Sequence, residues 1–415
     1  MFEYVFILAT FGQLLFVPLG GLMMDKLGLR VSKLVATALM CTGTMLFAFS
    51  KESTSEYLFG GSLIVAVSSN INLICNHQGS SMFPKFRGLV VALISGAYDS
   101  CTTVTTVASK LYPRISLQTY FTVLAWSALA CGTFVALFIL TERSVDMEKL
   151  AATNYSGSKE EDAEGNSGGI NKRCQDEVEI SGAINVDNTI RKIIFERYPT
   201  LKSCICSCPF LLVTLYFSLS QVRFSYFLAT LQAQLNYAFS DPTIVNEMLV
   251  TAIAFTGCGI LMGPVSGLLM DFCRLKTQQR IRRILEEPQV KTNLEKIYWI
   301  HVSALAIPVT ILATSSLTIS CLVFVTGSKV VYYVAFLVFL LFRSLLFSTV
   351  ANMLLISFPI ENYGLTYGIL CLTGGVFSAL QFALKQAPIL VSNGICLLIS
   401  ILSFIPPTIL FIKGR

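Results

Sequence analysis

Long apolar runs dominate this sequence and limit what it can fold into. A helix that crosses a membrane needs about 20 mostly apolar residues, and the chain holds eleven runs of about that length. Each run must be helical, because lipid offers no hydrogen-bond partner to an open backbone. We therefore expect an all-α polytopic membrane protein, with spans near residues 4–24, 32–50, 57–77, 88–108, 117–141, 205–230, 247–270, 298–321, 329–357, 364–384 and 388–412.

The composition supports this expectation. Only 13% of the residues are charged and the mean hydropathy is +0.69, whereas about a quarter of a soluble domain is charged. The net charge of +6 is mild, and the basic residues gather in a few loops, so no nucleic-acid partner is expected. The expected partners are the lipid bilayer and a small-molecule solute.

One eight-residue phrase occurs twice. Residues 18–25 read PLGGLMMD and residues 264–271 read PVSGLLMD, with five of eight positions identical. A second repeated motif, F-P followed by a short stretch and Gly, which we call the F-P…G echo, occurs at Phe83–Gly88 and at Phe358–Gly364. Both repeats are offset by six helices, so we expect two six-helix halves with eleven of twelve helices present. The first helix is then absent from this chain, and Met1 belongs to a truncated product or an incomplete gene model.

Loop charges predict the orientation and the domains. Lys and Arg mark cytoplasmic loops, and they gather in the loops after the first, third and seventh runs. We expect a multi-pass protein of the plasma membrane with a cytoplasmic C-terminus. Residues 1–141 form an N-terminal bundle (helices 2–6) and residues 204–415 a C-terminal bundle (helices 7–12). Between them, residues 142–203 form a largely disordered cytoplasmic loop.

Two details of that loop can be predicted. The sequon at Asn154 faces the cytoplasm and is not glycosylated. Residues 190–202 form a basic amphipathic segment that lies on the inner leaflet.

Ionisable groups at membrane depth are functional candidates. Asp99, Arg223 and Arg343 lie inside the fourth, sixth and ninth runs. The structural alternative is an ion pair of Arg223 with Asp99 between the two halves. His77 and His301 lie near helix ends, where an interfacial role is the usual one.

The chain contains no pattern typical of an enzyme or a cofactor site. We find no paired carboxylates, nucleophile–base set, phosphate loop or HExxH motif. Most of the thirteen cysteines lie in apolar runs as small hydrophobes. The C-x-C-x-C stretch at 204–208 is interpreted as an ordinary helix start, with zinc binding or acylation as alternatives. No enzyme activity, metal or cofactor is expected.

Residues 21–30, G-L-M-M-D-K-L-G-L-R, resemble the loop signature of the major facilitator superfamily, G-x-x-x-D-[RK]-x-G-[RK]-[RK]. Leu29 departs from it, and the second copy keeps only its Gly, Asp and Arg. The resemblance implies a cytoplasmic latch in which glycine allows close helix contact and the carboxylate meets a helix N-terminus or an Arg. The alternative is a plain positively charged turn. The predicted gating residues are Gly21, Asp25, Lys26, Gly28, Arg30, Gly267, Asp271 and Arg274.

Several stretches resemble solute carrier family 43. They are residues 18–30, S-G-A-Y-D-S at 95–100, K-L-Y at 110–112, Q-V-R at 221–223, G-L-L-M-D at 267–271 and F-R-S-L-L-F-S…F-P-I-E-N-Y-G-L-T-Y-G within 342–368. That family holds facilitative, sodium-independent carriers for large neutral amino acids and an equilibrative nucleobase carrier. Q-V-R resembles the amino-acid branch, and Asp99 after an aromatic residue resembles the nucleobase branch.

The resemblance implies alternating access around a midplane site lined by helices 4, 5, 7 and 10. We expect large neutral amino acids as substrates, with Arg223 and Asp99 binding the two charges of a zwitterion. A nucleobase is the alternative, and a non-transporting receptor or scaffold is a further one. The predicted substrate-binding residues are Asn72, Tyr98, Asp99, Gln221, Arg223, Phe224 and Arg343.

Overall fold

The computed structural model describes residues 2–51, 54–142, 186–286 and 293–415, and their side chains except those of 2–11 and 102. Every regular element in these ranges is a helix. The α-helices are α1 (Phe2–Leu27), α2 (Leu29–Phe49), α3 (Glu56–Gln78), α4 (Arg87–Asp99), α5 (Thr102–Leu111), α6 (Leu117–Phe134), α9 (Leu201–Ile205), α10 (Cys208–Ala238), α11 (Pro242–Gly257), α12 (Gly259–Glu286), α13 (Leu294–Val302), α14 (Ala306–Leu322), α15 (Lys329–Ser357), α16 (Tyr363–Ser378), α17 (Leu380–Gln386), α18 (Ile389–Leu402) and α19 (Ile405–Lys413).

Short 3₁₀-helical or π-helical turns precede or follow some of these helices. They are η2 (Gly79–Met82), η3 (Pro84–Phe86), η4 (Val135–Ile139), η5 (Ser303–Leu305) and η6 (Ile360–Asn362).

The helices agree with ten of the eleven expected membrane spans, and the exception is the first run, because α1 is not among the described helices that are long and apolar enough to cross a membrane. Among the described residues, nine helices are long and apolar enough to cross a membrane, or ten if α11 and α12, bent by 50°, form one span. Each of the eleven expected runs falls on one helix or on a consecutive pair, and the first run lies in α1. The all-α fold predicted from the apolar runs is confirmed.

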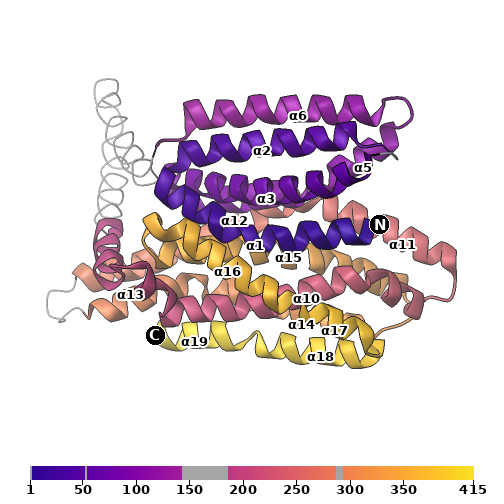
Figure 1. Ribbon diagram of the computed structural model, residues 1–415. Helices are drawn as coiled ribbons and strands as arrows, with labels where there is room; N and C mark the ends of the chain where they lie inside the picture. The colour runs from indigo at the N-terminus through magenta and orange to yellow at the C-terminus, as the bar shows by residue number, and fades with distance from the viewer. Residues whose placement is uncertain (1, 52–53, 143–185, 287–292) are drawn as a thin grey trace, which may run out of the picture.

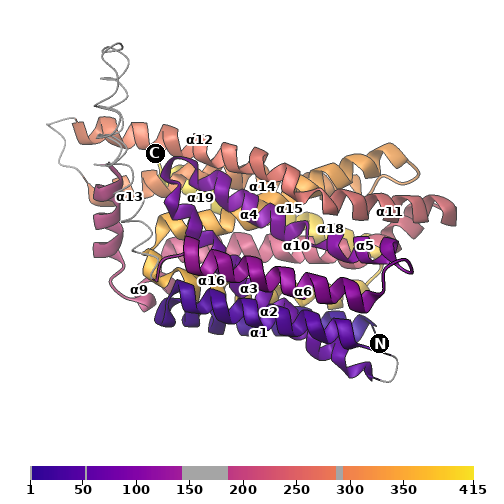
Figure 2. The same cartoon turned by 90° about the horizontal axis from the view of Figure 1, so that it is seen from above.

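Most of the helices run side by side along one common direction, and the N- and C-termini lie at opposite ends of the bundle (Figure 1). We call α1–α6 the N-terminal bundle and α10–α19 the C-terminal bundle. They meet along two seams, α1 against α16 and α4 against α12 (Figures 1 and 2). Each seam pairs one copy of the repeated phrase with a helix of the other bundle. We call the end that carries Asp25 and the C-terminus the Asp25 end.

The segment before α10 differs from the sequence prediction. Residues 186–197 are helical, and the apolar side chains of Val186, Ile190, Ile193 and Ile194 are buried in the main core. Their spacing of three and four residues places them on one helix face. That face packs against protein rather than lying on the inner leaflet. Residues 143–185, including the sequon at Asn154, lie outside the described residues.

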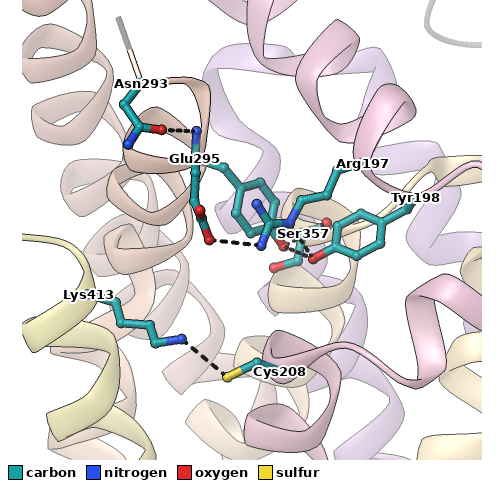
Figure 3. A network of polar contacts seen from close by, with 8 residues as sticks. Arg197, Tyr198, Cys208, Asn293, Glu295, Ser357 and Lys413 are labelled. Carbon is teal, nitrogen blue, oxygen red and sulfur yellow. Dashed lines mark hydrogen bonds and ion pairs between the residues drawn. The ribbon is translucent and has the colours of Figure 1, made fainter.

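A polar network fixes the end of this connecting helix (Figure 3). Arg197 lies 3.4 Å from Glu295 of α13 and over the Tyr298 ring. The Tyr198 hydroxyl donates to that of Tyr298 at 3.1 Å, which donates to the Ser357 carbonyl at 3.2 Å. The connecting helix is thereby joined to α13 and α15.

Candidate transport site

The two bundles share one buried ion pair. Asp99, at the end of α4, lies 2.9 Å from Nε of Arg343 on α15, and the two side chains are 2% and 12% exposed. A second guanidinium nitrogen, Nη2, donates to the Asp99 carbonyl at 3.3 Å. The Nε–H does not point at the carboxylate, so neither Asp99 oxygen has a hydrogen-bond donor among the described residues. The pair therefore keeps an acceptor and a donor for a further group.

Three phenylalanines pack beside this ion pair. Phe224 of α10 stacks on Phe339 of α15, with ring centroids 5.6 Å apart and planes 5° apart. Phe227 also contacts Phe339, with ring centroids 4.5 Å apart. The Arg343 guanidinium lies 5.7 Å from the centre of the Phe224 ring. A flat apolar surface thus adjoins the buried charges. The sequence analysis missed Phe339, although its position four residues before Arg343 places it on the same helix face.

Arg223 does not pair with Asp99. Its Nε donates to the Ser320 hydroxyl of α14 at 2.8 Å, and its guanidinium lies over Phe227. Successive residues of an α-helix point about 100° apart, so Phe224 faces α15 while Arg223 faces α14. The alternative ion pair of Arg223 with Asp99 is therefore replaced by the pair of Arg343 with Asp99.

The remaining predicted binding residues lie on the helices that flank the ion pair. Tyr98 precedes Asp99 on α4, and Asn72 lies on α3, where its amide donates to the Ser68 carbonyl at 3.1 Å. Gln221 lies on α10, and its buried carbonyl oxygen has no hydrogen-bond partner among the described residues. Among all the residues that the structure describes, no group of three His, Cys, Asp or Glu side chains could hold a metal ion.

The two repeated aspartates contact helix N-termini of the opposite bundle. Asp25 accepts hydrogen bonds from the backbone N–H groups of Gly364 (3.0 Å) and Leu365 (2.8 Å). These are the second and third residues of α16, where helical N–H groups have no partner within the helix. The expected contact between carboxylate and helix N-terminus is present.

Asp271 makes the same contact on the other seam. It accepts from the N–H groups of Gly88 (2.7 Å) and Leu89 (2.8 Å), the second and third residues of α4. The two sequence repeats are therefore joined crosswise, since each aspartate binds the F-P…G echo that belongs to the other half.

Glycine is needed where the seams are closest. A Cβ on Gly21 would clash with the Gly364 carbonyl, and a Cβ on Gly267 would clash with Cα of Leu89. Both clashes are with backbone atoms, which cannot move away as a flexible side chain can. The capped helices can approach the aspartates only because these two positions lack side chains.

The other loop residues have several different partners. Gly28 has φ +92°, and the next residue donates its N–H to the Glu142 carbonyl at 2.8 Å. Arg30 donates to the Leu140 carbonyl at 3.1 and 3.3 Å, while Lys26 is exposed.

Arg274 connects three parts of the chain. It lies on α12, donates to the Pro84 carbonyl of the N-terminal bundle at 3.0 Å and lies 3.6 Å from Asp187 of the connecting helix. The sequence could not identify Asp187 as its partner, because the two are far apart in the chain.

Both histidines are buried rather than interfacial. His77 is fully buried, with ring nitrogens 3.1 Å from the Tyr363 hydroxyl and 3.1 Å from the Ser95 hydroxyl. Because Tyr363 begins α16, His77 links the two bundles close to Asp25. His301 is 5% exposed. Each histidine was expected to have an interfacial role because it lies near a helix end, but neighbouring helices cover both side chains.

Comparison with known proteins identifies the family. The family model of the Major Facilitator Superfamily matches residues 1–382. The chain belongs to the major facilitator superfamily. Superfamily members transport solutes across membranes, and this chain is accordingly a multi-pass membrane transporter rather than an enzyme.

Two curated relatives cover most of the chain. Equilibrative nucleobase transporter 1 of Bos taurus is 24% identical over 421 residues, which span 98% of this chain and 82% of the relative. Protein FMP42 of Saccharomyces cerevisiae is 23% identical over 426 residues, which span 92% and 77%.

Solved superfamily structures share the fold. The human organic anion transporter MFSD10 has a TM-score of 0.52 at 16% identity and is matched over 98% of this chain and 82% of its own. The proton:xylose symporter XylE has a TM-score of 0.56 at 12% identity, over 99% and 86%.

Proposed function

We propose that this transporter is an equilibrative carrier for nucleobases, that it belongs with solute carrier family 43 in the plasma membrane, and that it works by alternating access. The observation that carries the substrate class is the pair of Asp99 and Arg343 beside Phe224. An acceptor and a donor with unused hydrogen-bonding capacity lie next to a flat aromatic surface. A nucleobase presents donors and acceptors on its edge and an aromatic face for stacking.

Two observations favour a nucleobase over the amino acid expected from the sequence. Arg223, the residue assigned to a substrate carboxylate, faces α14 and not the other bundle. The charges of Asp99 and Arg343 offset each other, which suits a neutral solute. The similarity to a protein named as a nucleobase transporter supports the same class.

A large neutral amino acid is the second candidate, and one observation favours it. Asp99 and Arg343 carry the two charges that a zwitterion needs, 2.9 Å apart. If the pair opened, the carboxylate could accept from a substrate ammonium and the guanidinium could bind a substrate carboxylate.

We propose that Asp25, Asp271 and the residues around them gate the Asp25 end. Their hydrogen bonds cross from one bundle to the other, so they must break when this end opens. They stabilise the closed state of this end and release it when the bundles separate.

Uptake into proteoliposomes tests the substrate class. With the purified chain incorporated and no ion gradient imposed, we expect saturable uptake of radiolabelled adenine, exchange with unlabelled adenine and no uptake of leucine. Leucine uptake without adenine uptake would transfer the assignment to the amino-acid branch. Uptake of neither solute would favour the receptor or scaffold alternative.

The aromatic surface has its own test. Phe224→Leu removes a stacking face worth about 1–3 kcal/mol per base, so we expect the adenine KM to rise by about 5- to 150-fold. Phe377→Leu, at a half-exposed position on α16, is the matched control and should leave KM unchanged. Equal effects of the two substitutions would exclude Phe224 as a stacking partner.

A further inference from the structure

Arg223 is a buried cation whose charge no neighbour offsets. It lies at the midpoint of α10 and is 1% exposed. Its Nε is bonded to Ser320, but both terminal nitrogens, Nη1 and Nη2, are buried without a hydrogen-bond partner in the described part of the chain. Arg223 also forms no ion pair with any described residue.

The groups around Arg223 are neutral. Ser320 and Ser316 each lie 2.8 Å from the Ser400 hydroxyl of α18, and that hydroxyl donates to the Cys396 carbonyl at 2.9 Å. This chain of hydroxyls holds the Nε edge of the guanidinium. It supplies no negative charge, and Phe227 covers one face of the group. The two terminal nitrogens therefore keep N–H groups that no described residue accepts.

A guanidinium in this setting requires an anion. Arginine stays protonated in proteins, so burial cannot be relieved by losing the proton. An uncompensated charge inside a membrane protein is strongly unfavourable. Two adjacent N–H donors on a planar group match a halide or a carboxylate.

We infer that Arg223 is the centre of a buried binding site for a small monovalent anion, held by Nη1 and Nη2 between α10, α14 and α18. The ligand is monovalent because one cation faces it, and small because Arg223 and its neighbours are packed in the C-terminal bundle. Its chemistry is that of chloride or of the carboxylate of a solute. The site is centred on Arg223 and not on the Asp99–Arg343 pair, which has its own partners.

The proposal is tested by the thermal stability of the purified chain in detergent. Chloride or bromide is exchanged for a bulky sulfonate, the MES anion, at constant ionic strength, and an anion that binds the folded state raises Tm in a saturable way. We expect this rise in wild type and its loss in Arg223→Gln. Arg283→Gln, at an exposed arginine of α12, is the control and should keep the wild-type response.

Other arms separate the two anion sources. Sodium acetate and leucine are added in the sulfonate buffer, and a rise in Tm with these but not with chloride assigns the site to a carboxylate. An unchanged halide and carboxylate response in Arg223→Gln, or no response in wild type, overturns the proposal.

Two further measurements test the anion site even if the Arg223→Gln variant misfolds. Arg223→Lys keeps the charge but loses the two-donor geometry, so the half-saturating anion concentration should rise about tenfold. Crystals grown in bromide should show anomalous scattering next to Nη1 and Nη2, and its absence there would contradict a halide. Because none of these readouts uses solute uptake, failure of the anion site and failure of nucleobase transport are distinguishable.

Discussion

At the scale of single residues, the decisive contact is the ion pair of Asp99 and Arg343. The Asp99 side chain is buried and that of Arg343 is 12% exposed, so each depends on the other for compensation of its charge. Removing one partner of a buried pair costs about 3–5 kcal/mol, whereas replacing both can be nearly neutral. The pair is therefore expected to behave as a unit under mutation.

Asp99→Asn and Arg343→Gln should each lower thermal stability by about 3–5 kcal/mol and abolish uptake. The double variant should recover most of the stability but not the uptake, because the substrate contacts are lost. Fluorescence-detected size exclusion after heating, together with adenine uptake, measures both. Glu286→Gln breaks the exposed pair with Arg282 and is the control, with an expected effect of about 0–1 kcal/mol. Additive losses in the double variant would contradict the coupling.

At the scale of helices, the two N-termini capped by aspartates join the bundles. The donors belong to α16 and α4, and the acceptors to α1 and α12. A charge at a helix N-terminus is worth about 0.3–1 kcal/mol at the surface and up to about 2 when partly buried. An interaction of this free energy is weak enough to break and re-form in each transport cycle.

Asp25→Asn and Asp271→Asn should slow transport while leaving surface expression nearly intact, since each removes about 1–2 kcal/mol from the closed state. Initial uptake rates and surface biotinylation measure the two effects. Asp241→Asn removes a charge that caps α11 within one bundle and should leave the rate unchanged. Wild-type rates in both seam variants would refute the gating role.

Gly21→Ala and Gly267→Ala should hold the seams apart, because the added methyl groups meet backbone atoms of the opposite bundle. We expect slower uptake and a lower Tm by several degrees, since overpacking costs about 1–3 kcal/mol. Gly394→Ala has open space around its Cβ and serves as the control. If Gly21→Ala and Gly267→Ala had the same Tm and uptake rate as Gly394→Ala, close packing at the seams would be contradicted.

At the scale of the whole molecule, the connecting helix packs on the C-terminal bundle at the Asp25 end, where Arg274 links it to the N-terminal bundle. Its apolar face packs in the core, and Arg274 contacts both Asp187 and the turn before α4. Closure of this end therefore involves three parts of the chain rather than two.

Ile194→Ser should undock the connecting helix, because loss of a buried aliphatic side chain costs about 2 kcal/mol or more. Local opening should rise about 30-fold, measured as the rate of trypsin cleavage at the exposed Arg191 and Lys192. Phe195 is 59% exposed on the same helix, so Phe195→Ser should cleave at the wild-type rate. Equal cleavage of both variants would show that the helix is not held by its buried face.

The sequence by itself determined the helices, the two-fold repeat and the chemistry of the loop aspartates. Run length decides that a segment spans lipid, and a repeated phrase at a six-helix offset predicts two related halves. The charged residues at membrane depth could also be found without coordinates, because such residues are expensive there.

The tertiary structure alone decided which of these groups meet. Periodicity places a residue on a helix face but does not say which helix lies opposite. For that reason the sequence suggested Arg223 as the partner of Asp99, and only the packing of α15 against α4 showed that the partner is Arg343. In the same way, the crosswise contacts of Asp25 with α16 and of Asp271 with α4 depend on how the two bundles face each other. The segments in each contact are more than 180 residues apart. No local sequence pattern encodes which of such distant segments meet.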